Sequence, residues 1–194
     1  DGAAPLSLGF RGEGVNALSF IGTMTIESRA RGKGDTIRKV LRNGQTLFNG
    51  MIGEAREFPG TTVHLRDMFS SMPVRRALLT GVDASKTLTQ VKSLMERFAL
   101  AAPTVELLLV DAWSRRIVWE HRACRSTRQA FGTLFGNDIG SSLTDRFVSS
   151  GRLETRVEVA ALLSPPLVSA MQNSSALQFI FVNGRPIPRA PKLE

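Results

Sequence analysis

The sequence predicts an α+β protein of two units, and three observations carry this prediction. Several short segments alternate apolar and polar residues, as half-buried strands do. One long segment carries a single apolar stripe at helical spacing. A basic and polar stretch over residues 121–127 interrupts these patterns. We therefore predict a domain boundary at that stretch, between residues 1–122 and residues 123–194.

The first unit is predicted to contain four strands before its long helix. They cover residues 23–30, 36–41, 45–52 and 61–68. Asn43-Gly44 joins the second strand to the third, because both residue types readily adopt the positive φ of a tight hairpin turn. A helix-like segment over residues 14–21 precedes the first strand. The pattern is typical of a sheet layer covered by helices.

The long helix is predicted over residues 85–102. Its apolar stripe recurs at spacings of three and four and consists of Leu88, Val91, Met95, Phe98 and Ala102. Asp83 or Ser85 can cap its start, and Pro103 ends it. Residues 104–110 and 116–120 then predict a hairpin.

The second unit is predicted to be smaller and also mixed. Its elements are a helix that starts at residue 126 or 127 and ends at 134, a long strand over 152–163, an apolar central strand over 177–182, a turn at Asn183-Gly184, and a basic exit over 185–192. Gly136 is placed to end the helix. The apolar run at 177–182 favours a strand in the middle of a sheet.

Composition and charge narrow the classes of protein. The chain has 194 residues, 42% of them hydrophobic, and no apolar run that approaches the length of a membrane span. The net charge of +8 favours a polyanionic partner such as DNA, and GC-rich codons, which raise the content of arginine and alanine, explain it equally well. The sequence shows no signal-peptide pattern. It also lacks an initiator Met, so we expect it to be an excised fragment.

The cysteine and the histidines indicate no metal or nucleophilic site. Cys124 is the only cysteine, so an internal disulfide is excluded, and we expect a buried or inert thiol there. His64 and His121 are isolated in the sequence, and we expect both to be structural. The scattered carboxylates form no pair for acid–base catalysis.

The run Gly9-Phe10-Arg11-Gly12-Glu13 precedes the first helix-like segment. Glycines allow positive φ and close approach of a ligand to the backbone. A helix start directs unpaired N–H groups at whatever lies in the loop, which favours a phosphate. Alone, this run also fits an ordinary loop.

Two further segments accompany this run. One is Gly60-Thr-Thr-Val-His-Leu-Arg-Asp-Met-Phe-Ser-Ser-Met-Pro-Val-Arg-Arg76, and the other contains Phe181-Val-Asn-Gly-Arg185. In order and spacing, the three segments resemble the N-terminal ATPase region of the MutL family of DNA mismatch-repair proteins, over the whole chain. Within that family the resemblance is greatest to the third eukaryotic MutL homologue, with the PMS-type paralogue next.

The resemblance implies a fold and a nucleotide site. The fold is a partial ATPase-type α/β sandwich over 1–122, followed by a partial transducer domain like domain 2 of ribosomal protein S5 over 123–194. ATP and Mg²⁺ are the implied cofactors of the intact protein. The residues implied to contact phosphate are Gly9, Phe10, Arg11, Gly12, Glu13 and Gly14. Thr61 is implied to lie at the adenine end. Gly14-Val15 replaces the family's Ala-Leu, which predicts a more mobile loop.

The resemblance also implies DNA contacts. Asn183, Arg185 and Arg189 fall in the unit that helps to form a basic groove in the family. Arg75 and Arg76 are further candidates. The alternatives are an exposed hairpin turn at 183–185 and, for Arg75 and Arg76, a solvated basic loop that starts at Pro73.

The family's catalytic Glu, Mg²⁺-binding Asn and transducer Lys find no counterpart among the 194 residues. We therefore expect no ATP hydrolysis by these residues alone.

The resemblance also implies partners. They are DNA, a second MutL-family subunit in a heterodimer, a MutS-type mismatch sensor and the sliding clamp; no membrane is implied. The implied location is the nucleus if the protein is eukaryotic and the cytoplasm otherwise. The resemblance also implies a role in meiotic recombination. The competing hypotheses are a non-catalytic, basic DNA-binding module and another ATPase of the superfamily, such as a topoisomerase subunit.

Overall fold

The computed structural model describes residues 12–79, 84–151, 157–165 and 177–187. These residues divide into two compact units near the start of the long helix. We call residues 12–87 the sheet unit and residues 88–187 the helix-and-hairpin unit. The predicted boundary between 122 and 123 is a different division and stays a prediction.

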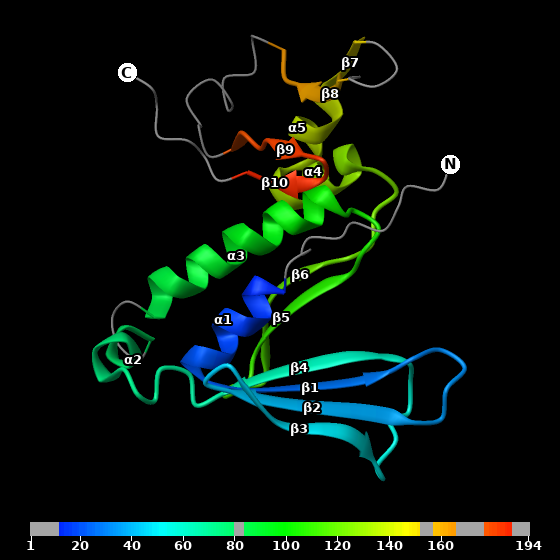
Figure 1. The fold of residues 1–194 in the computed structure, drawn as a ribbon. Helices are drawn as coiled ribbons and strands as arrows, with labels where there is room; N and C mark the ends of the chain where they lie inside the picture. The colour runs from blue at the N-terminus through cyan, green and yellow to red at the C-terminus, as the bar shows by residue number, and fades with distance from the viewer. Residues whose placement is uncertain (1–11, 80–83, 152–156, 166–176, 188–194) are drawn as a thin grey trace. The chain divides into compact units, whose positions relative to one another are not determined.

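The sheet unit is built on one four-stranded antiparallel sheet (Figure 1). Helix α1 (Glu13–Ile21) leads into β1 (Thr23–Arg29), and β2 (Thr36–Arg42), β3 (Gln45–Ile52) and β4 (Gly60–Arg66) follow. The strand order is β3-β2-β1-β4, so β4 returns to pair with β1. All four predicted strands are confirmed, and the Asn43-Gly44 turn has the expected positive φ values of 51° and 73°.

Helix α1 is fastened to the sheet by hydrogen bonds around a buried serine. Ser19 is fully buried. Its backbone carbonyl accepts from Asn43 N at 2.7 Å, and its hydroxyl accepts from Gly44 N at 3.1 Å. At the end of the helix, Ile21 O accepts from Phe69 N at 2.7 Å. These bonds tie α1 to the β2–β3 turn and to the segment after β4.

The segment after β4 is helical where the sequence predicted a loop. Residues 73–79 form helix α2 (Pro73–Leu79), whereas Pro73 was expected to begin a loop that carries Arg75 and Arg76. Proline is favoured at the first position of a helix, because its fixed φ suits the helix and its missing N–H would be unpaired there anyway. The two arginines therefore lie on a short helix.

The long predicted helix and the hairpin after it are confirmed. Helix α3 covers Ala84–Ala101, and the strands β5 (Leu107–Asp111) and β6 (Arg116–His121) pair in antiparallel register. Burial along α3 is greatest at its end, where Ala99 and Leu100 are buried. His121 closes the hairpin as a buried residue, with its Nε2 3.3 Å from Pro103 O and its ring stacked near Trp119.

An apolar cluster holds the helix-and-hairpin unit together. Helix α4 (Thr127–Phe135) is capped by Ser126, whose side chain accepts from Gln129 N, and Gly136 follows the helix as predicted. Helix α5 (Asn137–Ser142), which was not predicted, packs against α4. The buried residues of the cluster are Leu100, Cys124, Ala130, Phe131 and Leu143. Cys124 is thus a buried thiol, as expected.

The last strands differ from expectation. Strand β7 (Thr144–Ser150) was not predicted, and it pairs with β8 (Val157–Leu163), the described part of the strand predicted over 152–163. The apolar run at 177–182 was predicted to be a central strand, and this is wrong: only β9 (Phe181–Val182) is extended, and among the described residues it pairs with β10 (Arg185–Pro186) alone. Leu177, Phe179 and Phe181 instead pack on the apolar cluster, which accounts for the run's hydrophobicity.

The α+β class is confirmed by this arrangement of helices and antiparallel strands. Among the described helices, none combines the length and hydropathy needed to cross a membrane.

Candidate functional site

The start of α1 provides the geometry expected of a phosphate-binding backbone. Gly12 is the N-cap residue and has left-handed φ and ψ of 67° and 5°. The first helical bond runs from Asn16 N to Gly12 O at 3.1 Å. Gly12 has no side chain, so none of its own atoms caps the first turn. The backbone N–H groups of the first turn form the positive end of the helix dipole, where an anion is stabilised. Gly9, Phe10 and Arg11 lie outside the described residues.

Two residues of this turn modify its affinity for an anion. Glu13 places a carboxylate in the first turn, which stabilises the helix but repels a bound phosphate. Gly14 is solvent-exposed, and a Cβ added to it would have no neighbour within 4 Å. Gly14 therefore makes the turn easier to unwind without being required by packing.

Thr61 lies in β4, far along the sheet from the α1–β1 junction. Strand β4 pairs Arg66 with Thr23 and Thr61 with Ser28. The Thr61 hydroxyl lies 2.8 Å from Ser28 Oγ, on the exposed surface. Only one of the two hydroxyl hydrogens is used in this bond, so the other can donate to a further group. The contact of Thr61 with adenine therefore stays a prediction, and the geometry allows it.

A network of arginines and threonines fixes the backbone before Thr61. Arg29 Nη1 donates to the carbonyls of Arg56 and Glu57. Arg56 N donates to the buried Thr36 Oγ1 at 2.8 Å, and Arg56 Nη1 donates to Thr62 Oγ1. Arg56 also packs beside Gly60, whose φ of 148° requires glycine. The network therefore holds the Gly60-Thr61-Thr62 segment in one conformation.

The DNA candidates of the second unit lie on a small hairpin. Asn183 and Gly184 form the turn between β9 and β10, with φ values of 50° and 73°. Ile187 N donates to Ile180 O at 2.9 Å, which closes the hairpin. Asn183 is exposed and Arg185 is half-buried, so Asn183 is the more accessible of the two. Arg189 lies outside the described residues.

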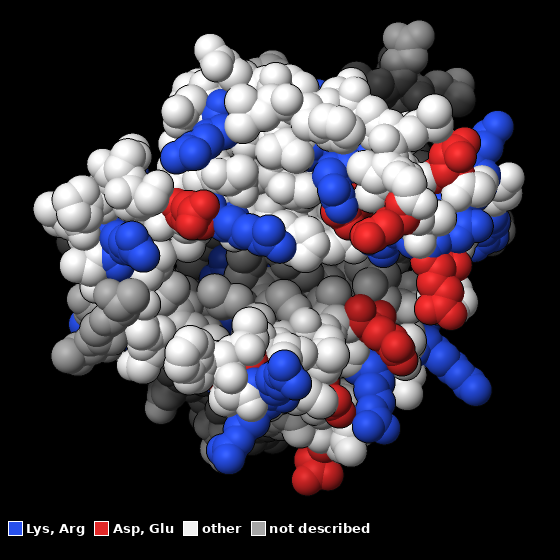
Figure 2. All heavy atoms as spheres, turned by 90° about the horizontal axis from the view of Figure 1, so that it is seen from below, with Lys and Arg blue, Asp and Glu red and all other residues white. Residues whose placement is uncertain are grey.

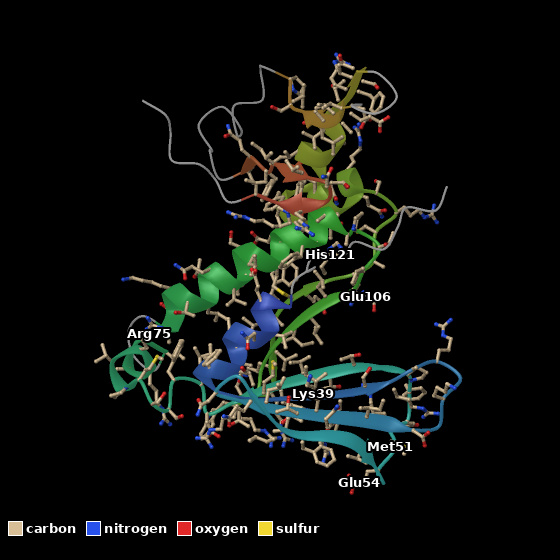
Figure 3. All side chains as sticks on the ribbon, viewed as in Figure 1. Lys39, Met51, Glu54, Arg75, Glu106 and His121 are labelled. Carbon is tan, nitrogen blue, oxygen red and sulfur yellow. The ribbon has the colours of Figure 1, made fainter. Side chains whose placement is uncertain are left out.

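Arg75 and Arg76 are exposed on α2, and Arg75 is labelled in Figure 3. They belong to the sheet unit, whereas Asn183 and Arg185 belong to the other unit. In the space-filling view of Figure 2, basic side chains are interspersed with acidic ones.

The remaining geometry limits what chemistry the described residues can perform. A shallow hollow lies at the end of α1, beside Arg42, Ser70 and Ser71. It is at the opposite end of the helix from Gly12, so it is not the predicted phosphate site. Within the described ranges, no three His, Cys, Asp or Glu side chains gather as metal ligands would. The described residues therefore fit a phosphate at Gly12.

The sequence-based predictions missed Ser28 and the Arg29–Arg56 network. Ser28 is found only through the pairing register of β1 with β4, which two separated strand patterns do not specify. Arg56 lies in the β3–β4 connection, and no local pattern indicates that its guanidinium folds back onto the sheet. The one available signal was Gly60, which marks a constrained backbone.

The chain has sequence relatives among known proteins. No protein-family model matches it. It is 30% identical over 147 residues to the DNA mismatch repair protein MLH3 of Arabidopsis thaliana, covering 76% of this chain and 13% of that protein. It is 29% identical over 191 residues to the DNA mismatch repair protein PMS1 of the same plant, covering 95% of this chain and 20% of that protein.

A bacterial relative gives the same result. The DNA mismatch repair protein MutL of Rhizorhabdus wittichii is 29% identical over 187 residues, which are 95% of this chain and 29% of that protein. The chain thus spans between 13% and 29% of the length of these relatives. The two plant relatives, MLH3 and PMS1, are the paralogues that the sequence was found to resemble most.

Solved structures share the fold. A crystal structure of the N-terminal domain of a DNA repair protein superposes with a TM-score of 0.72 at 20% identity, covering 94% of this chain and 56% of that one. The ATPase domain of MutL from Aquifex aeolicus, complexed with ADP, superposes with a TM-score of 0.62 at 20% identity, covering 97% of this chain and 68% of that one.

Proposed function

Because this chain belongs to the MutL family of DNA mismatch-repair proteins, in the N-terminal ATPase region of that family, we propose that it is part of an ATP-driven protein of mismatch repair. In this proposal the segment from Gly9 to Gly14 lies over the triphosphate, and Thr61 lies at the adenine end. The observation that carries the proposal is the left-handed Gly12 at an α1 start without a side-chain cap.

The role of each residue in nucleotide binding follows from backbone chemistry. The N–H groups of residues 13–15 donate to phosphate oxygens, and the helix dipole favours their charge. Gly12 keeps this turn open, because a side chain in left-handed conformation is strained. The ADP in the A. aeolicus MutL structure supports a nucleotide as the ligand. A bound Mg²⁺ would offset phosphate charge, with its ligands supplied by residues other than those described here.

The wider proposal concerns DNA and partners. Ordering of the segment by ATP would close a clamp around DNA, with Asn183, Arg185, Arg189, Arg75 and Arg76 as phosphate contacts. The intact protein would pair with a second MutL-family subunit and work with a MutS-type sensor and the sliding clamp. Its place would be the nucleus in a eukaryote, including meiotic recombination, and otherwise the cytoplasm. The +8 charge supports DNA as a partner, and the names of the relatives support a role in mismatch repair.

Two glycine variants of the intact protein test nucleotide binding. Gly12 and Gly32 both have left-handed φ, 67° and 76°, and a Cβ at either would meet nothing within 4 Å. Replacing either by alanine therefore imposes a similar local strain, roughly 1–2 kcal/mol. Only Gly12 precedes α1. We expect Gly12→Ala to weaken ATP binding at least fivefold and Gly32→Ala to leave it within twofold, by titration calorimetry.

Equal ATP affinity in both variants would reject Gly12 as part of the phosphate site. Failure of the wild-type intact protein to bind or hydrolyse ATP would reject the proposed function itself. The two results are separable, because the second is measured without any variant.

A second candidate function is a non-catalytic DNA-binding module, which the +8 charge favours. It predicts that the intact protein binds DNA with an affinity that falls steeply with salt and does not change with ATP. A change in DNA affinity on adding ATP would exclude this candidate.

A further inference from the structure

The turn between β5 and β6 presents a tryptophan to solvent. Trp113 is 96% exposed, the largest exposed fraction among the large hydrophobic residues that the structure describes. The chain's other tryptophan, Trp119, is half-buried in β6 next to His121. At this exposure almost none of the indole packs against the rest of the chain, so nearly its whole apolar area is available to a ligand.

Asp111 holds this turn in one conformation. Its two carboxylate oxygens accept from Trp113 N at 3.0 Å and from Ser114 Oγ at 2.6 Å. These bonds, first that of Ser114 and then that of Trp113, lower the pKa of Asp111 below its ordinary value. Arg115 follows with a φ of 54° and completes the reversal into β6. The backbone at Trp113 is therefore ordered before any ligand arrives.

Two arginines follow Trp113 closely in the sequence, at the same end of the hairpin. Arg115 and Arg116 are both exposed and follow Trp113 by two and three residues. Asp111 stays charged and pairs across the hairpin with Arg116, so the two arginines and one aspartate of the tip leave a net charge of +1. A ring with adjacent guanidinium groups is complementary to a nucleobase with its neighbouring phosphates.

We propose that Trp113, with Arg115 and Arg116, is a binding site for single-stranded DNA, in which an unpaired base stacks on the indole and the guanidinium groups contact phosphate. This site rests on the DNA binding proposed above and specifies its substrate as an unpaired strand. A duplex keeps its bases stacked inside, so it offers the indole no base face.

A protein partner is the other occupant that an exposed tryptophan can serve, since tryptophan and arginine are common in interface hot spots. The charge decides between the two. The basic tip belongs to a chain of net charge +8 whose relatives are DNA mismatch-repair proteins, and a polyanion matches that charge.

The test is the affinity of the intact protein for a labelled 20-nucleotide single strand and for the duplex of the same sequence, by fluorescence anisotropy. Trp113→Ala should weaken single-strand binding about tenfold, and Trp113→Phe should retain most of it. Duplex binding should change less than twofold. Replacing Arg115 and Arg116 together by alanine should reduce the slope of log affinity against log salt by about 1.4 for the single strand.

Phe147→Ala is the matched control, because Phe147 is also a large exposed aromatic of the same unit, at 63% exposure. It should leave both affinities unchanged. The proposal is overturned if Trp113→Ala matches this control, or if it weakens duplex binding equally. Loss of subunit assembly by Trp113→Ala with unchanged DNA affinity would assign the turn to a protein partner and also overturn it. Absence of any DNA binding by the wild type would instead reject DNA binding as a whole.

Discussion

The two units of this chain are stabilised in different ways. In the sheet unit, the fully buried residues are Met24, Ser19 and Thr36, and the two polar ones accept backbone N–H groups from distant turns. In the helix-and-hairpin unit, the core is an apolar cluster around Phe131, Ala130 and Leu143. A hydrogen-bonded core depends on particular partners, whereas an apolar core depends mainly on filled volume.

This difference matters for function. The predicted phosphate and adenine residues, Gly12 and Thr61, lie in the sheet unit, where hydrogen bonds fix the backbone near them. The Asn183–Arg185 turn and Trp113 lie on hairpins of the other unit, whose strands bury little. Directional bonds position a backbone site for a compact ligand, while protruding hairpins can reach an extended polymer.

The largest expected effect on stability comes from a substitution in the apolar core. Phe131 is 6% exposed, and its ring lies 4.8 Å from that of Phe135 and 6.1 Å from that of Phe179. Phe131→Ala should lower the free energy of unfolding of its unit by about 3–5 kcal/mol. Hydrogen exchange resolved by segment will show whether residues 88–187 lose protection while the sheet unit retains it. Phe147→Ala should stay within about 0.5 kcal/mol.

The next effect concerns the polar core. Ser19→Ala removes a fully buried hydroxyl that accepts from Gly44 N and donates to Asn16 O; the loss of both bonds should cost about 1–3 kcal/mol. Ser141 is a control, since its hydroxyl makes a similar local bond to Asp138 O on the exposed surface. Denaturant titration should show a loss for Ser19→Ala only. Equal effects would mean that the Ser19 bond is no more important than a surface bond.

The smallest expected effect concerns the helix start at the proposed phosphate site. Gly14→Ala has room for its methyl group and should stabilise α1 by up to about 1 kcal/mol. Because the helix start is part of the proposed phosphate site, ATP affinity should rise by up to about fivefold. Titration calorimetry of the two intact proteins measures this. Identical affinities would remove the prediction that Gly14 makes the loop more mobile.

Much of the sheet unit was predictable, because its signals are local. The Asn43-Gly44 turn and the alternating strands specify themselves within a few residues. The second unit was harder. The apolar run at 177–182 resembles a central strand, and only the packing of Leu177 and Phe179 on the cluster around Phe131 reveals its use. Helix α2 was missed because proline marks both loop starts and first helical positions.

The candidate site was predictable only where one motif contains it. The glycines of the first motif predict a phosphate loop, and Gly12 has a positive φ, which glycine allows. Ser28, which pairs with Thr61, depends on strand register. The exposure of Trp113 follows from how the β5–β6 hairpin packs, and this information is absent from the local sequence.

Hydrogen exchange at the start of α1 tests the central claim most directly. The N–H groups of Glu13, Gly14 and Val15 belong to exposed residues in a turn without a side-chain cap. In the intact protein with Mg²⁺, a non-hydrolysable ATP analogue should slow their exchange at least tenfold, because each N–H then donates to phosphate. The turn at Gly32 should not change. Unchanged exchange at residues 13–15 under saturating nucleotide would contradict the account.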